Sequence, residues 1–277
     1  MKLGKFEIYV ISDGLFQLDG GTMFGIVPKV IWSKFLQVDQ NNMALWGTHC
    51  LLVVVKGKKI LIETGIGSKL DSKKKKIYGR SDDGAFSQNL KKAGFSFEEI
   101  DFVIPTHLHM DHAGGFTCFE NGKLKTRFSK ARYLIQKKEW EAAIHPTRLS
   151  RGSYWEENFL PVLDHHQVEW LDGDIELLQG LDIMLTGAHS QGHQAIKIFS
   201  EGKTLFCGGD LIPSRWHVRQ TFVCAYDLCP MEVSELKTKW LERAYQEDWI
   251  LHWYHDPEMP FGKVNKEGEN FVGDLRK

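Results

Sequence analysis

The stretch "IPTHLHMDHAGG", Ile104–Gly115, holds three histidines and one aspartate within six positions. It follows the apolar run "IDFV", which predicts a short buried strand. His107 and His109 are two residues apart on an extended segment and therefore point the same way, whereas Asp111 and His112 fall on the turn that follows. Imidazole and carboxylate groups are ligands for divalent metal ions, so this stretch predicts part of a site for two adjacent ions.

Three further candidate ligands also follow predicted strands. His193 comes after "LDIMLTG", Asp210 after "KTLFCGG" and His255 after "WILHWY". Functional sites in layered α/β folds collect at strand ends, so these residues are expected to meet the histidine motif. Asp210 is the expected bridge between two ions because two glycines before it allow a close approach of the backbone. His189 is expected to support the ligands without being one of them.

Composition narrows the class of protein. The 277 residues are 42% apolar, and 35 basic residues balance 36 acidic ones. This balance argues against a nucleic-acid partner or an anionic membrane surface. No apolar run approaches the roughly 20 residues that span a bilayer. An odd set of five cysteines without a CxxC pair predicts reduced thiols, and hence a cytoplasmic protein.

The pattern of strands and helices predicts one domain over residues 1–277. "LLVVVK" and "KKILIETG" indicate a hairpin about Gly57, and "EIYVIS", "ARYLIQ" and "AIKIFS" indicate further strands, with "WILHWYHD" as the last regular element. "AFSQNLKKAG", "KKEWEAAIH" and "MEVSELKTKWLERAYQED" have helical spacing. Strands in two groups, each followed by helices, predict two packed sheets with helices outside.

Two segments stand outside this pattern. "LDGGTMFGIVPKVIWSKF", residues 18–35, is an apolar series that predicts either an N-terminal hairpin packed on the core or a loop that forms an apolar substrate wall. "HPTRLSRGSYWEENFLPVLDHH", residues 145–166, has no clear period and is interpreted as a helical cap.

Taken in order, the motifs resemble the metallo-β-lactamase superfamily: "ETG" at Glu63–Gly65, HxHxDH, "GAHSQGH", "GGD" and a late histidine. The resemblance implies an α+β fold, a four-layer αββα sandwich of two mixed sheets with helices outside. It implies a ligand set in which one ion is bound by His107, His109 and His193, the second by Asp111, His112 and His255, and both by Asp210. Glu63 stands where the superfamily usually has an aspartate that orients a metal-bound histidine. The histidine at position 109 disfavours the oxygen-reducing branch, which resembles this motif but carries a glutamate there.

Two divalent ions that share a water lower its pKa and supply a hydroxide at neutral pH. This predicts hydrolysis, with Zn²⁺ as the expected metal and Mn, Fe or Co as alternatives. Asp111 is the candidate for taking or returning a proton. The metal ligands alone do not choose among an ester, lactone, thioester, amide or phosphoester.

"DGGTMFGIVPKVIW", "YWEEN" and "AYD" resemble the N-acyl-homoserine lactonase branch, which opens lactone rings in quorum quenching. The resemblance implies a small-molecule substrate whose apolar acyl tail contacts Met23, Phe24, Ile26, Val27, Trp32, Tyr154 and Trp155, and it suggests a homodimer. Some lactonases of this branch use a tyrosine three residues after the bridging aspartate; here that position is Pro213, and Tyr226 is the candidate substitute.

Three other hypotheses remain open at this stage. The first is a thioesterase of the glyoxalase II type, and the second is a phosphotriester or aryl-ester hydrolase on the same site. The third is a non-catalytic, metal-binding regulatory protein.

Overall fold

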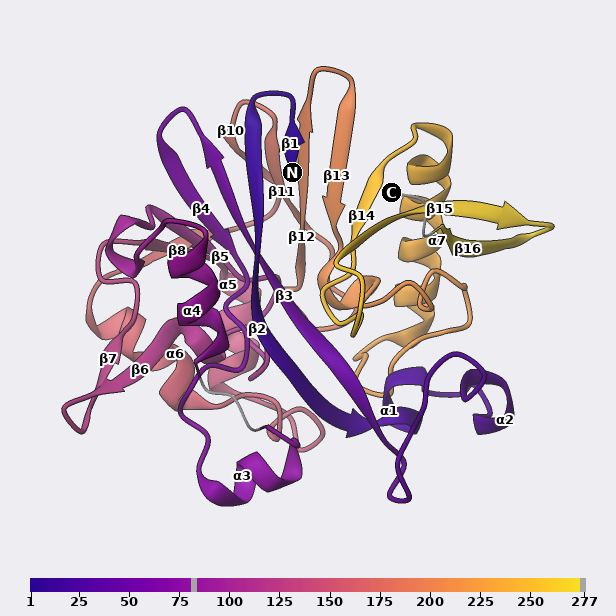
Figure 1. Cartoon of the computed structure of the whole chain (residues 1–277), viewed down its shortest axis with the longest axis horizontal. Coiled ribbons are helices and arrows are strands. Elements are labelled where there is room, and N and C mark those ends of the chain that lie inside the picture. Colours follow the sequence, from indigo (N-terminus) through magenta and orange to yellow (C-terminus); the bar gives the residue numbers. More distant parts are fainter. Residues whose placement is uncertain (81–83, 275–277) are drawn as a thin grey trace.

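A computed structural model describes residues 1–80 and 84–274 and contains two seven-stranded sheets (Figure 1). The first sheet has the order β1-β2-β3-β4-β5-β8-β9. Its strands are β1 (Lys2–Leu3), β2 (Phe6–Asp19), β3 (Met43–Val55), β4 (Lys58–Ile62), β5 (Phe102–Ile104), β8 (Arg132–Gln136) and β9 (Val168–Leu171). The predicted hairpin about Gly57 is confirmed: β3 and β4 pair antiparallel, and Gly57 has a φ of 77°.

The second sheet runs in chain order from β10 to β16. Its strands are β10 (Ile175–Leu178), β11 (Leu181–Leu185), β12 (Gln194–Ser200), β13 (Lys203–Cys207), β14 (Ile250–His252), β15 (Phe261–Glu267) and β16 (Asn270–Asp274). Both sheets mix parallel and antiparallel pairs, since β4 pairs parallel with β5 and β13 pairs parallel with β14. A separate small sheet joins β6 (Thr117–Glu120) to β7 (Lys123–Thr126).

Seven α-helices accompany the sheets in the described part of the chain. They are α1 (Gly20–Phe24), α2 (Lys29–Trp32), α3 (Ser72–Ile77), α4 (Ala85–Lys92), α5 (Lys137–Ile144), α6 (Glu156–Asp164) and α7 (Pro230–Gln246). Short 3₁₀ turns lie between α4 and β5 at η1 (Phe97–Glu99), between β5 and β6 at η2 (Gly114–Phe116) and directly after β13 at η3 (Gly209–Leu211). The predicted helices over 85–94, 137–145 and 231–248 correspond to α4, α5 and α7 and are confirmed.

Three apolar layers hold the sandwich together. Residues such as Leu51, Ile104 and Ile196 form the core between the two sheets. The outer face of the first sheet is covered by α4, α5 and α6, and the outer face of the second by α7, whose Leu241 packs into that layer. Figure 1 shows this αββα order, with α4 and α7 on opposite sides of the molecule. The predicted fold class is therefore confirmed.

The C-terminal hairpin was not predicted. "WILHWYHD" was expected to be the last regular element, but β15 and β16 follow it and pair antiparallel across a turn at Gly268, whose φ is 62°. The alternation in this segment is weak because its side chains are mostly polar, and the buried apolar side chains among those described are Val264 and Phe271. A hairpin with so few apolar residues gives little signal in sequence.

Both irregular segments contain helices. Residues 18–35 carry α1 and α2 at the far end of the long β2–β3 ribbon (Figure 1). Residues 145–166 form turns and then α6, which packs against η2 and the β6–β7 hairpin. Within residues 1–80 and 84–274, no helix combines the length and the apolar character needed to cross a membrane.

Candidate metal centre

Side chains from four separate loops meet at one edge of the sandwich. The loop after β5 carries His107, His109, Asp111 and His112, and the loop between β11 and β12 carries His189 and His193. Asp210 lies in η3 directly after β13, and His255 follows β14. The strand ends thus bring together residues up to 148 positions apart in sequence, from His107 to His255.

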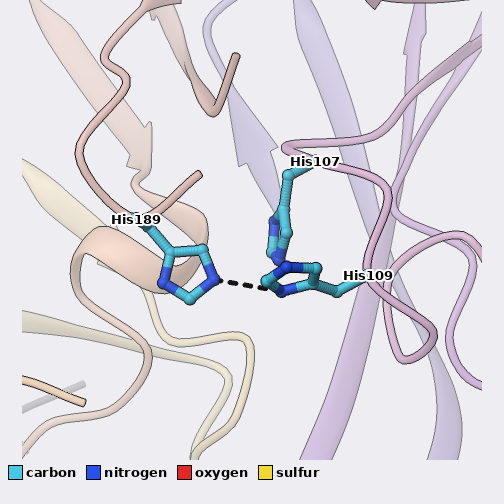
Figure 2. A group of neighbouring side chains, drawn as sticks. All are labelled: His107, His109 and His189. Atoms are coloured by element: carbon cyan, nitrogen blue, oxygen red, sulfur yellow. Dashed lines mark hydrogen bonds between the residues drawn. The ribbon is translucent and has the colours of Figure 1, made fainter. Parts of the chain in front are cut away.

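One group of possible metal ligands consists of His107, His109 and His189, whose donor nitrogens lie within 4.8 Å of one another. Figure 2 shows the three rings converging from two loops, with His109 Nδ1 and His189 Nε2 separated by 3.2 Å. All three rings are buried, at most 7% exposed. Two ring nitrogens that face each other so closely are the arrangement expected around a shared cation.

The family resemblance implied His193 at the third position of this group, whereas the donor atom that lies within 4.8 Å of those of His107 and His109 belongs to His189. His193 Nδ1 instead hydrogen-bonds with Thr186 Oγ1 at 2.6 Å, and its ring lies 5.3 Å from that of His107. Both histidines flank the same short turn, "HSQGH", so sequence spacing alone does not distinguish them. The contact with Asp227 distinguishes the two histidines. The Asp227 carboxylate accepts a hydrogen bond from His189 Nδ1 at 2.7 Å, which directs His189 Nε2 toward the group.

A second group consists of Asp111, His112 and His255. His255 Nε2 lies 3.5 Å from Asp111 Oδ2 and 3.2 Å from His112 Nε2. Asp210 lies between the two groups. Its Oδ1 is 3.2 Å from the Nε2 atoms of both His112 and His255, and its Oδ2 is 3.4 Å from His189 Nε2. One carboxylate therefore offers a different oxygen to each group.

Hydrogen bonds behind the rings set which nitrogen is free. His255 Nδ1 donates to Gly47 O at 2.8 Å, and His112 Nδ1 donates to Glu63 Oε1 at 3.0 Å. Thr106 Oγ1 donates to the same Glu63 oxygen at 2.5 Å and so can accept from His107 Nδ1 at 3.0 Å. Each partner keeps the proton on Nδ1 and leaves Nε2 as the ligand atom. Glu63 thus contacts His112, the kind of contact that the resemblance implied for a residue that orients a histidine ligand.

Burial and neighbouring charges shift the pKa values of the site residues in different directions. Burial lowers the pKa values of His107 and His109 well below the ordinary value, which keeps both rings neutral. Burial also lowers the pKa of His112, but the carboxylates of Asp210 and Glu63 outweigh it and raise that pKa well above the ordinary value. Burial alone would raise the pKa of Asp210, yet the nearby imidazoles hold it well below the usual range. The neutral rings of His107 and His109, together with the ionised Asp210 carboxylate, offer lone pairs that suit divalent cations.

Buried ligand atoms without hydrogen-bond partners also support the binding of divalent cations at this site. His107 Nε2 and Asp210 Oδ1 are buried and have no hydrogen-bond partner among the described residues. Buried polar atoms without a partner are costly, and here they point into the same small volume. Imidazole and carboxylate without thiolate suit Zn²⁺ and also Mn, Fe or Co. The residues present therefore fit two metal ions.

Two cavities open onto this centre. The first, of about 270 Å³, reaches Asp111, Asp210 and His255 and is walled by apolar side chains that include Leu18, Met23 and Met110. The second, of about 300 Å³, reaches His109 and His189 and extends past Tyr154 toward His145. His109, Leu149, Ser153 and Tyr226 line both cavities.

Of the residues expected to contact an acyl tail, some line the cavities and others lie in the core or at the surface. Met23 and Tyr154 line the cavities. Phe24, Val27 and Trp32, which belong to the 18–35 segment, instead pack into a buried apolar cluster and are at most 7% exposed. In the described part of the chain they line neither cavity. Ile26 points outward and is 81% exposed, and Trp155 contacts Tyr78 and Lys74. The segment thus forms two short helices in place of the expected hairpin, with some side chains packed in the core and Leu18 and Met23 at a cavity.

Tyr226 is among the residues that line both cavities. Its hydroxyl is 3.0 Å from Thr22 Oγ1, and the side chain is 41% exposed.

Two residues that hydrogen-bond to the ligand loops, Asp227 and Glu139, were given no role from sequence. Asp227 ends the quoted "AYD" motif, but its contact with a histidine 38 positions earlier leaves no local signal.

A family model described as the metallo-beta-lactamase superfamily matches residues 44–255 of this chain. The chain belongs to the metallo-β-lactamase superfamily. The match begins in β3 and ends at His255, so it includes every candidate ligand.

Among curated relatives, the N-acyl homoserine lactonase AiiA of Bacillus thuringiensis subsp. kurstaki is 29% identical over 170 residues, which are 58% of this chain and 60% of the relative. An N-acyl homoserine lactonase of Bacillus cereus is 31% identical over the same length, with the same two shares. The chain therefore spans less than two thirds of the length of the curated relatives it matches.

Solved structures match over the whole chain. A probable metal-dependent hydrolase from Staphylococcus aureus has a TM-score of 0.91 at 30% identity and covers 100% of this chain and 99% of its own. The dizinc quorum-quenching lactonase AidC, in complex with a product, has a TM-score of 0.82 at 22% identity, with coverage of 100% and 96%. At this identity the second match establishes the shared fold.

Proposed function

We propose that the protein is a dinuclear metal-dependent hydrolase that opens the ring of N-acyl homoserine lactones. The observation that carries this proposal is the place of Asp210, which offers one carboxylate oxygen to each of two ligand groups at the floor of a cavity. A shared carboxylate between two ions is typical of two-metal hydrolases.

The proposed ligand set follows the geometry. One ion is assigned to His107, His109 and His189, the second to Asp111, His112 and His255, and Asp210 contacts both. His189 takes the place that the sequence had assigned to His193. Zn²⁺ is the proposed metal, because four-coordinate sites rich in neutral imidazole suit it.

Bound there, two divalent ions would activate a water and stabilise the charge that develops on a substrate carbonyl. Asp111 lies on the cavity floor, 8% exposed, with Oδ2 3.5 Å from His255. We assign to it the return of a proton to the alcohol oxygen released when the ring opens. The Tyr254 hydroxyl donates to the Asp111 backbone carbonyl at 2.5 Å and so holds the loop in place.

Tyr226 is assigned to the substrate carbonyl. A neutral phenol is a hydrogen-bond donor, and this one lies at the junction of both cavities, where its present contact with Thr22 can be exchanged for one to a ligand. It stands in for the tyrosine that Pro213 replaces. The apolar walls formed by Leu18, Met23 and Met110 suit an acyl chain, since burial of methylene groups contributes about 0.8 kcal/mol each.

The choice of a lactone among carbonyl and phosphoryl substrates rests on the sequence similarity of this chain to its curated relatives. The curated relatives at 29–31% identity are named N-acyl homoserine lactonases. A thioester of the glyoxalase II type and a phosphotriester or aryl ester would use the same ligands. These substrates therefore form the comparison panel.

The test is hydrolysis of N-butanoyl and N-decanoyl homoserine lactone by protein loaded with two equivalents of Zn²⁺, with and without chelator. We expect ring opening that stops with chelator and is lost in Asp210→Asn. Asp172→Asn is the matched control, because the Asp172 side chain is 71% exposed and pairs only with Lys137 at the surface. Two bound ions with no lactone hydrolysis would contradict the proposal. Turnover of a thioester or phosphotriester would then assign the other enzyme class, and no turnover at all would favour a metal-binding regulatory protein.

A further inference from the structure

Glu139 lies in the first turn of α5 and is 1% exposed, yet it is not one of the candidate ligands. Its carboxylate accepts four hydrogen bonds. Oε1 accepts from Leu108 N at 2.9 Å and from the Tyr154 hydroxyl at 3.1 Å. Oε2 accepts from Ser190 Oγ at 2.6 Å and from Gly192 N at 3.2 Å.

The two oxygens of the Glu139 carboxylate contact different ligand loops. Leu108 lies between His107 and His109, so Oε1 holds the HxHxDH loop. Ser190 follows His189 directly, and Oε2 therefore holds the loop between β11 and β12. One carboxylate connects the two loops that supply the first group of ligands.

The contact between α5 and the second loop is close. A Cβ atom at Gly192 would lie 2.1 Å from the backbone nitrogen of Glu139, so only glycine fits there. No ion pair among the described residues involves Glu139, and its four hydrogen-bond donors are uncharged. An anionic acceptor strengthens such hydrogen bonds, which makes this buried carboxylate a rigid connection.

We propose that Glu139 is a positioning residue that sets the distance between the two ligand loops and thereby the affinity for the ion held by His107, His109 and His189. The inference rests on the proposed ligand set but not on the substrate. The second ion, assigned to Asp111, His112 and His255, has no ligand on the loop between β11 and β12, so a change in the distance between the two loops that Glu139 connects acts on the first site.

Glu139→Gln is the decisive variant. Glutamine has one acceptor oxygen, and its amide nitrogen faces donors on whichever loop it does not serve. Zinc content and dissociation constants are measured by competition with a chromogenic chelator for the wild type and the variant. We expect one ion to bind about 10- to 100-fold more weakly, as for other residues that orient metal ligands, and the other ion to bind as in the wild type.

Glu141→Gln is the matched control, since Glu141 is an exposed residue on the same helix. Thermal unfolding of the metal-free proteins checks the fold; general destabilisation would weaken both ions alike. If Glu139→Gln does not fold, Ser190→Ala removes a single hydrogen bond to Oε2 and takes its place. Unchanged affinity for both ions, or equal loss of both, in the folded variant would overturn the inference. A wild type that binds no pair of ions would instead contradict the proposed ligand set.

Discussion

His189 Nδ1 lies 2.7 Å from Asp227 Oδ1, and this contact decides which histidine of the "HSQGH" turn faces the metal centre. A carboxylate only accepts hydrogen bonds at neutral pH, so Nδ1 carries the proton and Nε2 is left toward His109, 3.2 Å away. Asp227 also accepts from Cys224 N at 2.8 Å, which holds its carboxylate in place.

Asp227→Asn tests this contact. The amide keeps the size of the side chain but loses the charge that stabilises the His189 N–H. We expect the affinity for one Zn²⁺ to fall about tenfold, because residues that orient metal-bound histidines commonly contribute this much. Chelator competition measures it, with Asp182→Asn as the control, since Asp182 pairs with Lys197 away from the site. An affinity equal to that of the wild type would contradict the orienting role.

His189→Gln and His193→Gln separate the two candidate ligands. Elemental analysis after dialysis should find about one ion per chain in His189→Gln and two in His193→Gln. The reason is that only the His189 ring is among the donor atoms grouped within 4.8 Å. The reverse pattern would restore the assignment made from the sequence.

Glu63→Asp tests the length of the side chain behind His112. Glu63 has a φ of 64°, a conformation that aspartate adopts more readily than glutamate, so the backbone is not strained by the change. The shorter carboxylate cannot hold both Thr106 and His112 as Glu63 does. We expect the second ion to bind about tenfold more weakly in competition assays. Equal or tighter binding would show that the longer side chain is dispensable.

Lys237 is fully buried in α7, and its ammonium group donates to Phe222 O. Burial lowers its pKa from the ordinary 10.5 to about 8. Between these values the unfolded chain binds more protons than the native protein, so stability rises with pH. At about 1.4 kcal/mol per pH unit, the wild type should gain about 3 kcal/mol relative to Lys237→Met from pH 8 to 10.5.

Urea denaturation at a series of pH values measures this difference. Lys239→Met, an exposed position on the same helix, should follow the wild type at every pH. A difference between wild type and Lys237→Met that does not change with pH would show that the buried lysine has an ordinary pKa.

Tyr226→Phe tests the proposed contact with a substrate carbonyl. Loss of one hydrogen bond that forms in the transition state should lower kcat/KM for acyl homoserine lactones by tenfold or more, with both zinc ions retained. Tyr245→Phe, on the exposed side of α7, is the control. Unchanged kinetics in Tyr226→Phe would remove the tyrosine from the mechanism.

Local sequence was sufficient for much of this protein. Alternating and apolar runs predicted the β3–β4 hairpin, the helices α4 and α7 and the layered fold, because these elements bury side chains at regular spacing. HxHxDH at the end of β5 predicted a metal centre, since four ligand-type residues within six positions share one loop.

Only the tertiary structure chose between His189 and His193, and only it identified Glu139 and Asp227. His189 and His193 flank one turn, but the His189 ring contacts Asp227, 38 residues further along the chain, whereas the His193 ring contacts Thr186. Glu139 acts through Leu108 and Gly192, 31 residues before it and 53 after it. Hydrogen bonds between residues so far apart in sequence depend on how the layers pack. The periodicity of a single segment therefore does not predict them.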